Sequence, residues 1–321
     1  MAEPLLAIKD LKTYFLSKDK EVKAVDGIDI DVYPRQIVCI VGESGCGKSM
    51  TSLSIMRLVP KPRGKIVGGK IVFNGKDLLG LTEEQMTNVR GNDISMIFQE
   101  PMTALNPVLT IGDQITEVLI RHRAMPKRQA LDKAIEMLQF VGVPRAREIV
   151  HEYPHQLSGG LRQRVMIAMA MVCEPKLLIA DEPTTALDVT IQAQVLELMK
   201  KMREDFDTSI ILITHDLGVV ADMADHVVVM YAGQVVESVN ADEMFSEPLH
   251  PYTQALLAAI PTLDEEKEIL YAIPGTVPDA GAFPVGCRFA DRCALAEAGC
   301  FEKMPDLREV KSGHFVRCHL V

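Results

Sequence analysis

The sequence predicts an α/β fold: a mixed, largely parallel sheet with helices, an inserted helical subdomain, and a small C-terminal appendage. Short apolar runs of strand length alternate with segments of helical spacing, which is typical of parallel strands joined by helices. A glycine-rich loop stands directly after one such strand and directly before a helix. From about Asn106 to Met171 the apolar residues recur at three- and four-residue spacings, so this block is expected to be helical.

In the first third of the chain, Leu5–Val32 alternates apolar and polar residues around turn signals, which predicts two or three antiparallel strands. Gln36–Val41 is a short apolar strand that leads into the glycine-rich loop. Lys48–Leu58 then has helical spacing, and two prolines beyond it end the helix. Lys70–Phe73 is another short strand, closed by a turn at Asn74-Gly75.

Strands return in the second half at Leu177–Ala180, Ser209–Thr214 and His226–Met230, with a helix over Ile191–Phe206 between the first two. A loop-rich appendage begins near residue 245 and contains many prolines and glycines. We expect a main domain over 1–245, with its helical subdomain at about 100–172, and a C-terminal extension over 246–321.

The chain has 321 residues, of which 48% are hydrophobic and 24% charged, as in ordinary globular proteins. Its formal net charge of −10 argues against a nucleic-acid partner. No apolar run approaches the roughly 18 residues that a spanning helix needs, and the first residues do not resemble an export signal. We therefore expect a cytoplasmic chain that reaches a membrane only through a partner.

The glycine-rich loop fits the phosphate-binding pattern G-x-x-x-x-G-K-[ST] without a mismatch. Its glycines let backbone N–H groups approach phosphate oxygens, and the following helix presents its positive end to them. Lys48 is expected to reach the β- and γ-phosphates, and the Ser49 hydroxyl to ligate Mg²⁺. The expected nucleotide contacts in this region are Gly42, Glu43, Ser44, Gly45, Cys46, Gly47, Lys48, Ser49 and Met50.

An acidic pair, Asp181 and Glu182, follows the apolar strand at Leu177–Ala180. Asp181 is placed to hold Mg²⁺ through water, and Glu182 to polarise the attacking water. His215 comes just past another strand, where a sensor of the γ-phosphate would be needed. Gln99 follows the strand Ile94–Phe98 and could reach both Mg²⁺ and that water.

Between the loop and the acidic pair stands Leu157-Ser158-Gly159-Gly160, followed by Leu161-Arg162-Gln163-Arg164. This order of motifs resembles the ATP-binding cassette (ABC) family over about residues 5–240. The glycine-rich loop corresponds to Walker A and Leu157–Gly160 to the signature, while Leu177–Asp181 corresponds to Walker B. Gln99 then matches the Q-loop residue, Glu182 the catalytic carboxylate, Ala186–Asp188 the D-loop, and His215 the switch histidine. Leu161 stands where many members have Gln.

The resemblance implies an ABC-type P-loop ATPase core that uses ATP and Mg²⁺, with Mg²⁺ held by Ser49, Gln99 and Asp181. Two such chains meet head to tail, and each ATP lies between one chain's Walker A and the other's signature. Ser158, Gly159 and Gly160 would make that second contact. An aromatic ring should stack on adenine: Phe15 aligns best, Tyr14 is the alternative, and either ring could instead be a core residue.

A closer resemblance lies in the tail, where His250–Leu256 is similar to a C-terminal motif of oligopeptide and dipeptide importer ATPases. It implies ATP hydrolysis that drives peptide import, on the inner face of the cell membrane. The implied partners are two membrane permease subunits, a second ATPase or a second copy of this chain, and an extracytoplasmic peptide-binding protein. The helical insert, including Pro101–Pro107, would dock on the permeases.

Other functions stay open. Nickel or metal-chelate importers share the tail motif. Soluble ABC ATPases of DNA repair or translation usually carry long coiled coils or two cassettes per chain, and neither pattern is present here. A metal- or redox-sensing regulator that only binds ATP would not need Glu182 and His215.

Four cysteines crowd into the tail with wide spacings: Cys287, Cys293, Cys300 and Cys318. Structural zinc sites favour tighter pairs, so the spacing favours a [4Fe–4S] cluster, with Zn²⁺ or no metal as alternatives. Some importer ATPases that the tail resembles bind such a cluster. His314 and His319 flank the last cysteine and could replace a ligand. Cys39, Cys46 and Cys173 are interpreted as packing residues or small spacers.

Overall fold

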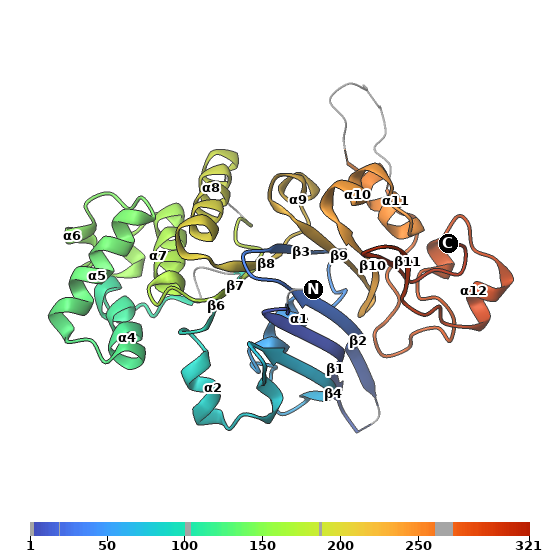
Figure 1. Cartoon of the computed structure of the whole chain (residues 1–321), viewed down its shortest axis with the longest axis horizontal. Helices are drawn as coiled ribbons and strands as arrows, with labels where there is room; N and C mark the ends of the chain where they lie inside the picture. The colour runs from blue at the N-terminus through green and yellow to red at the C-terminus, as the bar shows by residue number, and fades with distance from the viewer. Residues whose placement is uncertain (1–2, 19, 100–103, 186–187, 261–271) are drawn as a thin grey trace. The chain divides into compact units, whose positions relative to one another are not determined.

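The computed structural model describes residues 3–18, 20–99, 104–185, 188–260 and 272–321 (Figure 1). The chain divides into two compact units. Unit 1 comprises Met1–Tyr33, Ile37–Leu79 and Thr214–Val321, and unit 2 comprises Pro34–Gln36 and Gly80–Ile213. The residues after 245 thus belong to the same compact unit as the N-terminal strands, and the domain boundary expected there stays a prediction.

Unit 1 contains an antiparallel sheet in the order β2-β1-β4-β5. Its strands are β1 (Leu6–Leu16), β2 (Glu21–Val32), β4 (Gly64–Phe73) and β5 (Lys76–Asp77). The antiparallel N-terminal strands are therefore confirmed. β4 begins earlier than predicted because its first half, rich in glycine and lysine, carries little of the apolar signal that marks a strand.

The other strands of unit 1 lie in the order β11-β12-β10-β9-β3. They are β3 (Ile37–Val41), β9 (His226–Tyr231), β10 (Gln234–Asn240), β11 (Arg308–Lys311) and β12 (His314–Val316). β3 and β9 are parallel, whereas the remaining pairs are antiparallel, so the sheet is mixed. Because β12 pairs with β10, the tail extends the sheet instead of hanging from it.

The helical segments of unit 1 are short: α1 (Lys48–Ile55), α9 (Leu217–Met223), α10 (Ala241–Ser246), α11 (Pro251–Ala258), α12 (Ala298–Glu302), and the 3-10 turns η1 (Leu78–Gly80) and η3 (Ala290–Arg292). The predicted end of α1 at Leu58 was wrong. Arg57 adopts the left-handed conformation, with φ of 53°, and this stops the helix before the downstream prolines do.

Unit 2 contains three parallel strands, β6 (Ile94–Ile97), β7 (Leu177–Asp181) and β8 (Ser209–Ile213), with β7 in the middle. Every residue of β7 and β8 is buried. Burial on both faces explains why these strands read as continuous apolar runs rather than as alternating ones. The strands predicted here are confirmed.

The predicted helical block is confirmed by α4 (Ile111–Arg123), α5 (Lys127–Phe140), α6 (Ala146–Ile149), η2 (Pro154–Gln156) and α7 (Gly159–Met171). The helix predicted over Ile191–Phe206 is α8 (Val189–Phe206), and α2 (Glu83–Val89) is a helix that the sequence analysis missed. In Figure 1, α4 to α7 gather into one cluster. Hydroxyl or carboxylate side chains of Thr110, Ser158 and Asp188 cap α4, α7 and α8. Over the described part of the chain, no helix combines the length and the apolar character needed to cross a membrane.

One histidine of unit 1 is kept neutral by its surroundings. His226 begins β9, and its Nε2 lies 2.8 Å from the Ser238 hydroxyl on β10. Burial lowers the pKa of His226 from 6.5 to about 4, because the charged imidazolium would lose its water. In the unfolded chain this ring takes up a proton as the pH falls through 6.5, whereas in the folded chain it does so only near 4.

Acid should therefore destabilise the protein through His226. Between pH 6.5 and 4 the unfolded state binds the extra proton, so the free energy of unfolding falls by up to about 1.4 kcal/mol for each pH unit lost. Urea unfolding of wild type and His226→Gln at pH 7, 5.5 and 4.5 measures this term. We expect the variant to lose stability less steeply. The exposed His151→Gln is the control, and parallel slopes for wild type and His226→Gln would contradict the assignment.

Candidate functional site

The phosphate loop connects β3 to α1 in a conformation that needs glycine. Gly42, Gly45 and Gly47 have φ of 145°, 80° and 105°. A Cβ on Gly42 would lie 2.1 Å from the Met230 carbonyl oxygen, and one on Gly47 would lie 2.4 Å from the Ala24 carbonyl oxygen. Only glycine satisfies both the dihedral angles and the space at these two positions.

Lys48, the first residue of α1, lies inside this loop. Its side chain is buried, and Nζ donates to the carbonyl oxygens of Gly42 at 2.7 Å and Glu43 at 3.1 Å. Gly47 caps α1 without a side-chain hydrogen bond, so the first N–H groups of the helix have no side-chain acceptor at the cap. An ammonium group beside a helix N-terminus that lacks a side-chain cap fits a nucleotide phosphate.

The remaining residues of the loop differ in their exposure to solvent. Ser44 and Gly45 are exposed, while Ser49 and Met50 are half-buried in the first turn of α1. Cys46 is fully buried, and burial raises the pKa of its thiol. Cys46 therefore packs beneath the loop, as predicted, and keeps its proton.

The two aromatic candidates for adenine stacking both have partners within unit 1. The Tyr14 hydroxyl donates to the Asp26 carboxylate, and burial followed by this hydrogen bond raises the Tyr14 pKa. Phe15 packs near the start of β4, where a Cβ on Gly64 would lie 3.1 Å from its ring. Stacking of either ring on adenine stays a prediction.

His215 is exposed, and the backbone on both sides of it is held in place. The preceding Thr214 donates its N–H to the Ile40 carbonyl of β3. The following Asp216 caps α9 by accepting from the Gly218 N–H at 2.9 Å. The histidine thus stands on a short, fixed segment between the core and a helix start.

In unit 2, Gln99 and Glu182 contact each other, and their roles at an attacking water stay predictions. Gln99 Nε2 donates to Glu182 Oε2 at 3.0 Å, and the Thr185 hydroxyl donates to the same oxygen at 3.0 Å. Glu182 has φ of 46°, and its N–H donates to Ile213 of β8. Glu182 thus leaves the extended conformation of β7, and its left-handed backbone conformation costs about 1–2 kcal/mol. Asp181 is buried at the end of β7.

The signature residues stand at the start of α7. Ser158 caps this helix by accepting from the Leu161 N–H at 3.4 Å. Ser158 and Gly159 are exposed, and a Cβ on Gly159 would meet nothing within 4 Å. The buried Gln163 donates to the Pro183 carbonyl at 2.5 Å, which ties this helix to the segment after Glu182. The start of α7 is therefore accessible at Ser158 and Gly159.

Two expected elements fall partly outside the described residues: Ala186 and Leu187 of the D-loop, and the first half of Pro101–Pro107. Asp188, the last D-loop residue, is described and caps α8 by accepting from the Ile191 N–H at 2.9 Å.

The four tail cysteines line one pocket, together with His250, Phe289 and His319. All four are free thiols, and burial raises the pKa of Cys287, Cys293 and Cys318. The Leu320 N–H donates to Cys318 Sγ at 3.4 Å. Yet among the described residues no group of three or more His, Cys, Asp or Glu is arranged to hold a metal ion. The pocket gathers sulfur ligands, but the geometry does not establish the predicted metal site.

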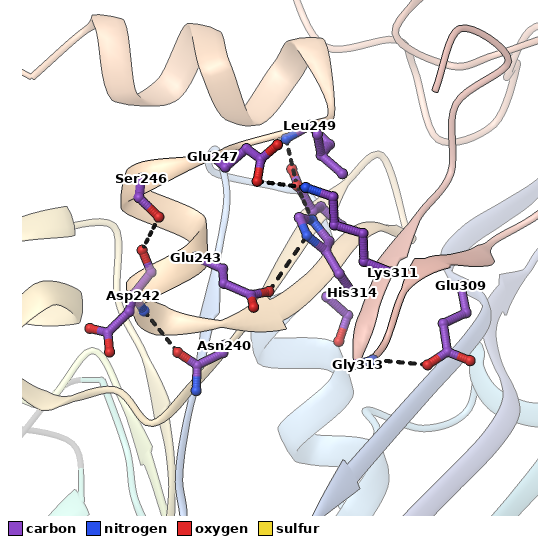
Figure 2. A network of polar contacts seen from close by, with 12 residues as sticks. Asn240, Asp242, Glu243, Ser246, Glu247, Leu249, Glu309, Lys311, Gly313 and His314 are labelled. Carbon is purple, nitrogen blue, oxygen red and sulfur yellow. Dashed lines mark hydrogen bonds and ion pairs between the residues drawn. The ribbon is translucent and has the colours of Figure 1, made fainter.

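His314 does not face this pocket, so its suggested role as a substitute ligand was wrong. Its Nε2 lies 2.7 Å from Glu237 Oε1, and its Nδ1 lies 3.8 Å from Glu243 (Figure 2). Glu237 is fully buried and also accepts from the N–H groups of Leu249 and His250. This network joins β12 to β10 and α10, because a buried carboxylate needs donors.

Comparison with known proteins places these features in a family. Residues 25–185 match the model of the ABC transporter family, and residues 236–300 match the oligopeptide/dipeptide transporter C-terminal region. The oligopeptide transport ATP-binding protein AppD of Bacillus subtilis (strain 168) is 59% identical, over 98% of this chain and 96% of that protein. The dipeptide transport ATP-binding protein DppD of the same organism is 50% identical, over 99% of this chain and 95% of that protein.

Solved structures agree with these matches. A dimeric ATP-binding cassette in a post-hydrolysis state, bound to ADP and Pi, is 26% identical with a TM-score of 0.66. The match covers 74% of this chain and 98% of that cassette. The chain belongs to the ABC transporter family, and its tail is the C-terminal region found in oligopeptide and dipeptide transporters.

Proposed function

We propose that this chain is the ATPase subunit that drives import of di- or oligopeptides through a membrane ABC transporter. The observation that carries the proposal is the hydrogen bond between Gln99 and Glu182, which assembles the groups that hydrolysis requires beyond nucleotide binding. The named relatives are transport ATP-binding proteins for oligopeptides and dipeptides. They do not favour a nickel importer or a soluble ABC ATPase.

In this proposal each group has a defined task. The phosphate loop and Lys48 bind the β- and γ-phosphates, because they combine inward N–H groups with a buried ammonium. Ser49, Asp181 and Gln99 would hold Mg²⁺, which would offset the charge on those phosphates when bound. Glu182 accepts a hydrogen bond from the attacking water and takes its proton, while Gln99 and Thr185 fix the carboxylate.

The exposed start of α7 supports a dimeric active form. Ser158, Gly159 and Gly160 present the positive end of this helix to a ligand that lies outside unit 2. We infer that this ligand is the nucleotide of a second ATPase subunit, either a copy of this chain or a similar one. The dimer would sit on two permease subunits at the inner face of the membrane, served by an extracytoplasmic peptide-binding protein.

For the tail, we propose that Cys287, Cys293, Cys300 and Cys318 hold a [4Fe–4S] cluster as a structural clasp. One pocket collects all four thiols, and a backbone N–H already donates to one sulfur, as the sulfurs of such clusters commonly accept. A cluster with four irons accepts thiolates that approach separate corners, whereas a single zinc ion needs them to converge on one point. The tail around this pocket is rich in loops and benefits from a covalent tie.

The hydrolysis assignment is tested with Glu182→Gln. The amide keeps the size of the side chain but cannot take a proton, so we expect ATP turnover to fall about 100-fold or more. ATP binding should persist, and ATP should hold the variant as a dimer on size-exclusion chromatography. Glu204→Gln, an exposed change on α8, is the matched control. Turnover near the wild-type rate in Glu182→Gln would remove the basis for the assignment.

The tail assignment is tested by anaerobic purification with metal analysis and a visible spectrum. We expect about four irons per chain and a brown colour in wild type, both lost in Cys293→Ser and both kept in Cys173→Ala. One zinc per chain without colour would replace the cluster by a structural zinc site. Wild type free of iron and zinc would leave a thiol pocket only.

A further inference from the structure

Glu43, the second residue of the phosphate loop, is held from outside the loop by the C-terminal extension. Its N–H donates to the Tyr252 hydroxyl of α11 at 2.9 Å. Its two carboxylate oxygens accept from Arg292 at the end of η3, with Nη1 2.7 Å from Oε2 and Nη2 3.0 Å from Oε1. Three hydrogen bonds, all within unit 1, thus join the tail to one loop residue.

Arg292 is itself fixed on every side. Its side chain is 4% exposed, Nε donates to the Pro274 carbonyl at 2.8 Å, and Nη1 lies 3.3 Å from the Tyr231 hydroxyl. The guanidinium also lies 5.9 Å from the centre of the Phe289 ring. A planar guanidinium with two parallel bonds to a carboxylate sets direction as well as distance, unlike an exposed ion pair.

Tyr252 is as rigid as Arg292. It is fully buried, and its ring packs against Tyr231 and Phe289, with centroids 4.7 and 5.3 Å away. Burial raises the pKa of its hydroxyl, and the hydroxyl oxygen accepts from the Glu43 N–H. Packing against Tyr231 and Phe289 therefore fixes the position of the Tyr252 hydroxyl oxygen.

The carbonyl of this same Glu43 accepts from Lys48 Nζ at 3.1 Å. Whatever fixes the Glu43 backbone therefore also fixes one of the two carbonyl groups that orient the lysine ammonium. We propose that Arg292 and Tyr252 are positioning residues for ATP binding, acting through Glu43 on the loop and on Lys48. This inference rests on the ATPase function proposed above and assigns part of that function to the tail.

The test uses the full chain and compares kcat, KM and the Kd for ATP. Arg292→Gln should raise KM and Kd about 10-fold, the effect of losing about 1.4 kcal/mol, while kcat changes less than about threefold. Arg292→Lys keeps the positive charge but cannot donate two parallel hydrogen bonds to the Glu43 carboxylate. Its KM and Kd should therefore lie between those of wild type and Arg292→Gln. Lys311→Gln breaks an exposed tail ion pair with Glu247 and should leave all three constants unchanged.

A double-mutant cycle separates positioning from a general loss of stability. Adding Arg292→Gln to Glu43→Gln should cost little more than either change alone, because both disrupt the same charged two-point contact. Additive effects, or a KM for Arg292→Gln equal to that of wild type, would overturn the proposal.

Tyr252→Phe provides an independent variant, since it removes only the hydroxyl and keeps the buried ring. It should raise KM in the same direction as Arg292→Gln even where the arginine variant folds poorly, and an unchanged KM would count against the proposal. A wild-type chain that binds ATP but never hydrolyses it would instead contradict the ATPase function, so the two failures are distinguishable.

Discussion

The geometry of the phosphate loop and of α1 depends on one constraint: the loop lies very close to the backbone carbonyl groups of Met230 and Ala24. Gly42 lies against the end of β9, and Gly47 lies against β2, at separations that leave no room for a side chain. This contact fixes where α1 begins and therefore where Lys48 enters the loop. One strand from each of two sheets, β9 and β2, thus restricts the conformation of the phosphate loop.

Unit 2 achieves a comparable precision through strain and hydrogen bonding. Glu182 leaves β7 in a left-handed conformation that an adjacent strand holds through the Ile213 carbonyl. Gln99 and Thr185 then satisfy the same carboxylate oxygen. A strained residue that its surroundings hold so firmly is typical of sites where chemistry requires one orientation. The signature helix shares this support, since Gln163 bonds to the residue that follows Glu182.

Local features of this chain were predictable, and contacts between distant segments were not. The phosphate loop, the acidic end of β7 and the helical block each carry their signal within a few neighbouring residues, and the structure confirms these elements. Nothing near Arg292 in the sequence indicates a bond to Glu43, because the two are 249 residues apart. The error over His314 had a usable signal: Glu237 interrupts an apolar strand and needed a buried donor.

The order of synthesis gives the contact between loop and tail another consequence. A ribosome adds about 5–20 residues per second, so Glu43 is made roughly 10 to 50 s before Arg292, 249 positions later. During that interval the phosphate loop lacks the two hydrogen bonds from the Arg292 guanidinium to Glu43. A chain interrupted before η3 keeps every nucleotide motif of its N-terminal half but not their final alignment. On the proposal made above, a chain becomes a full-strength ATP binder only once Arg292 has been added.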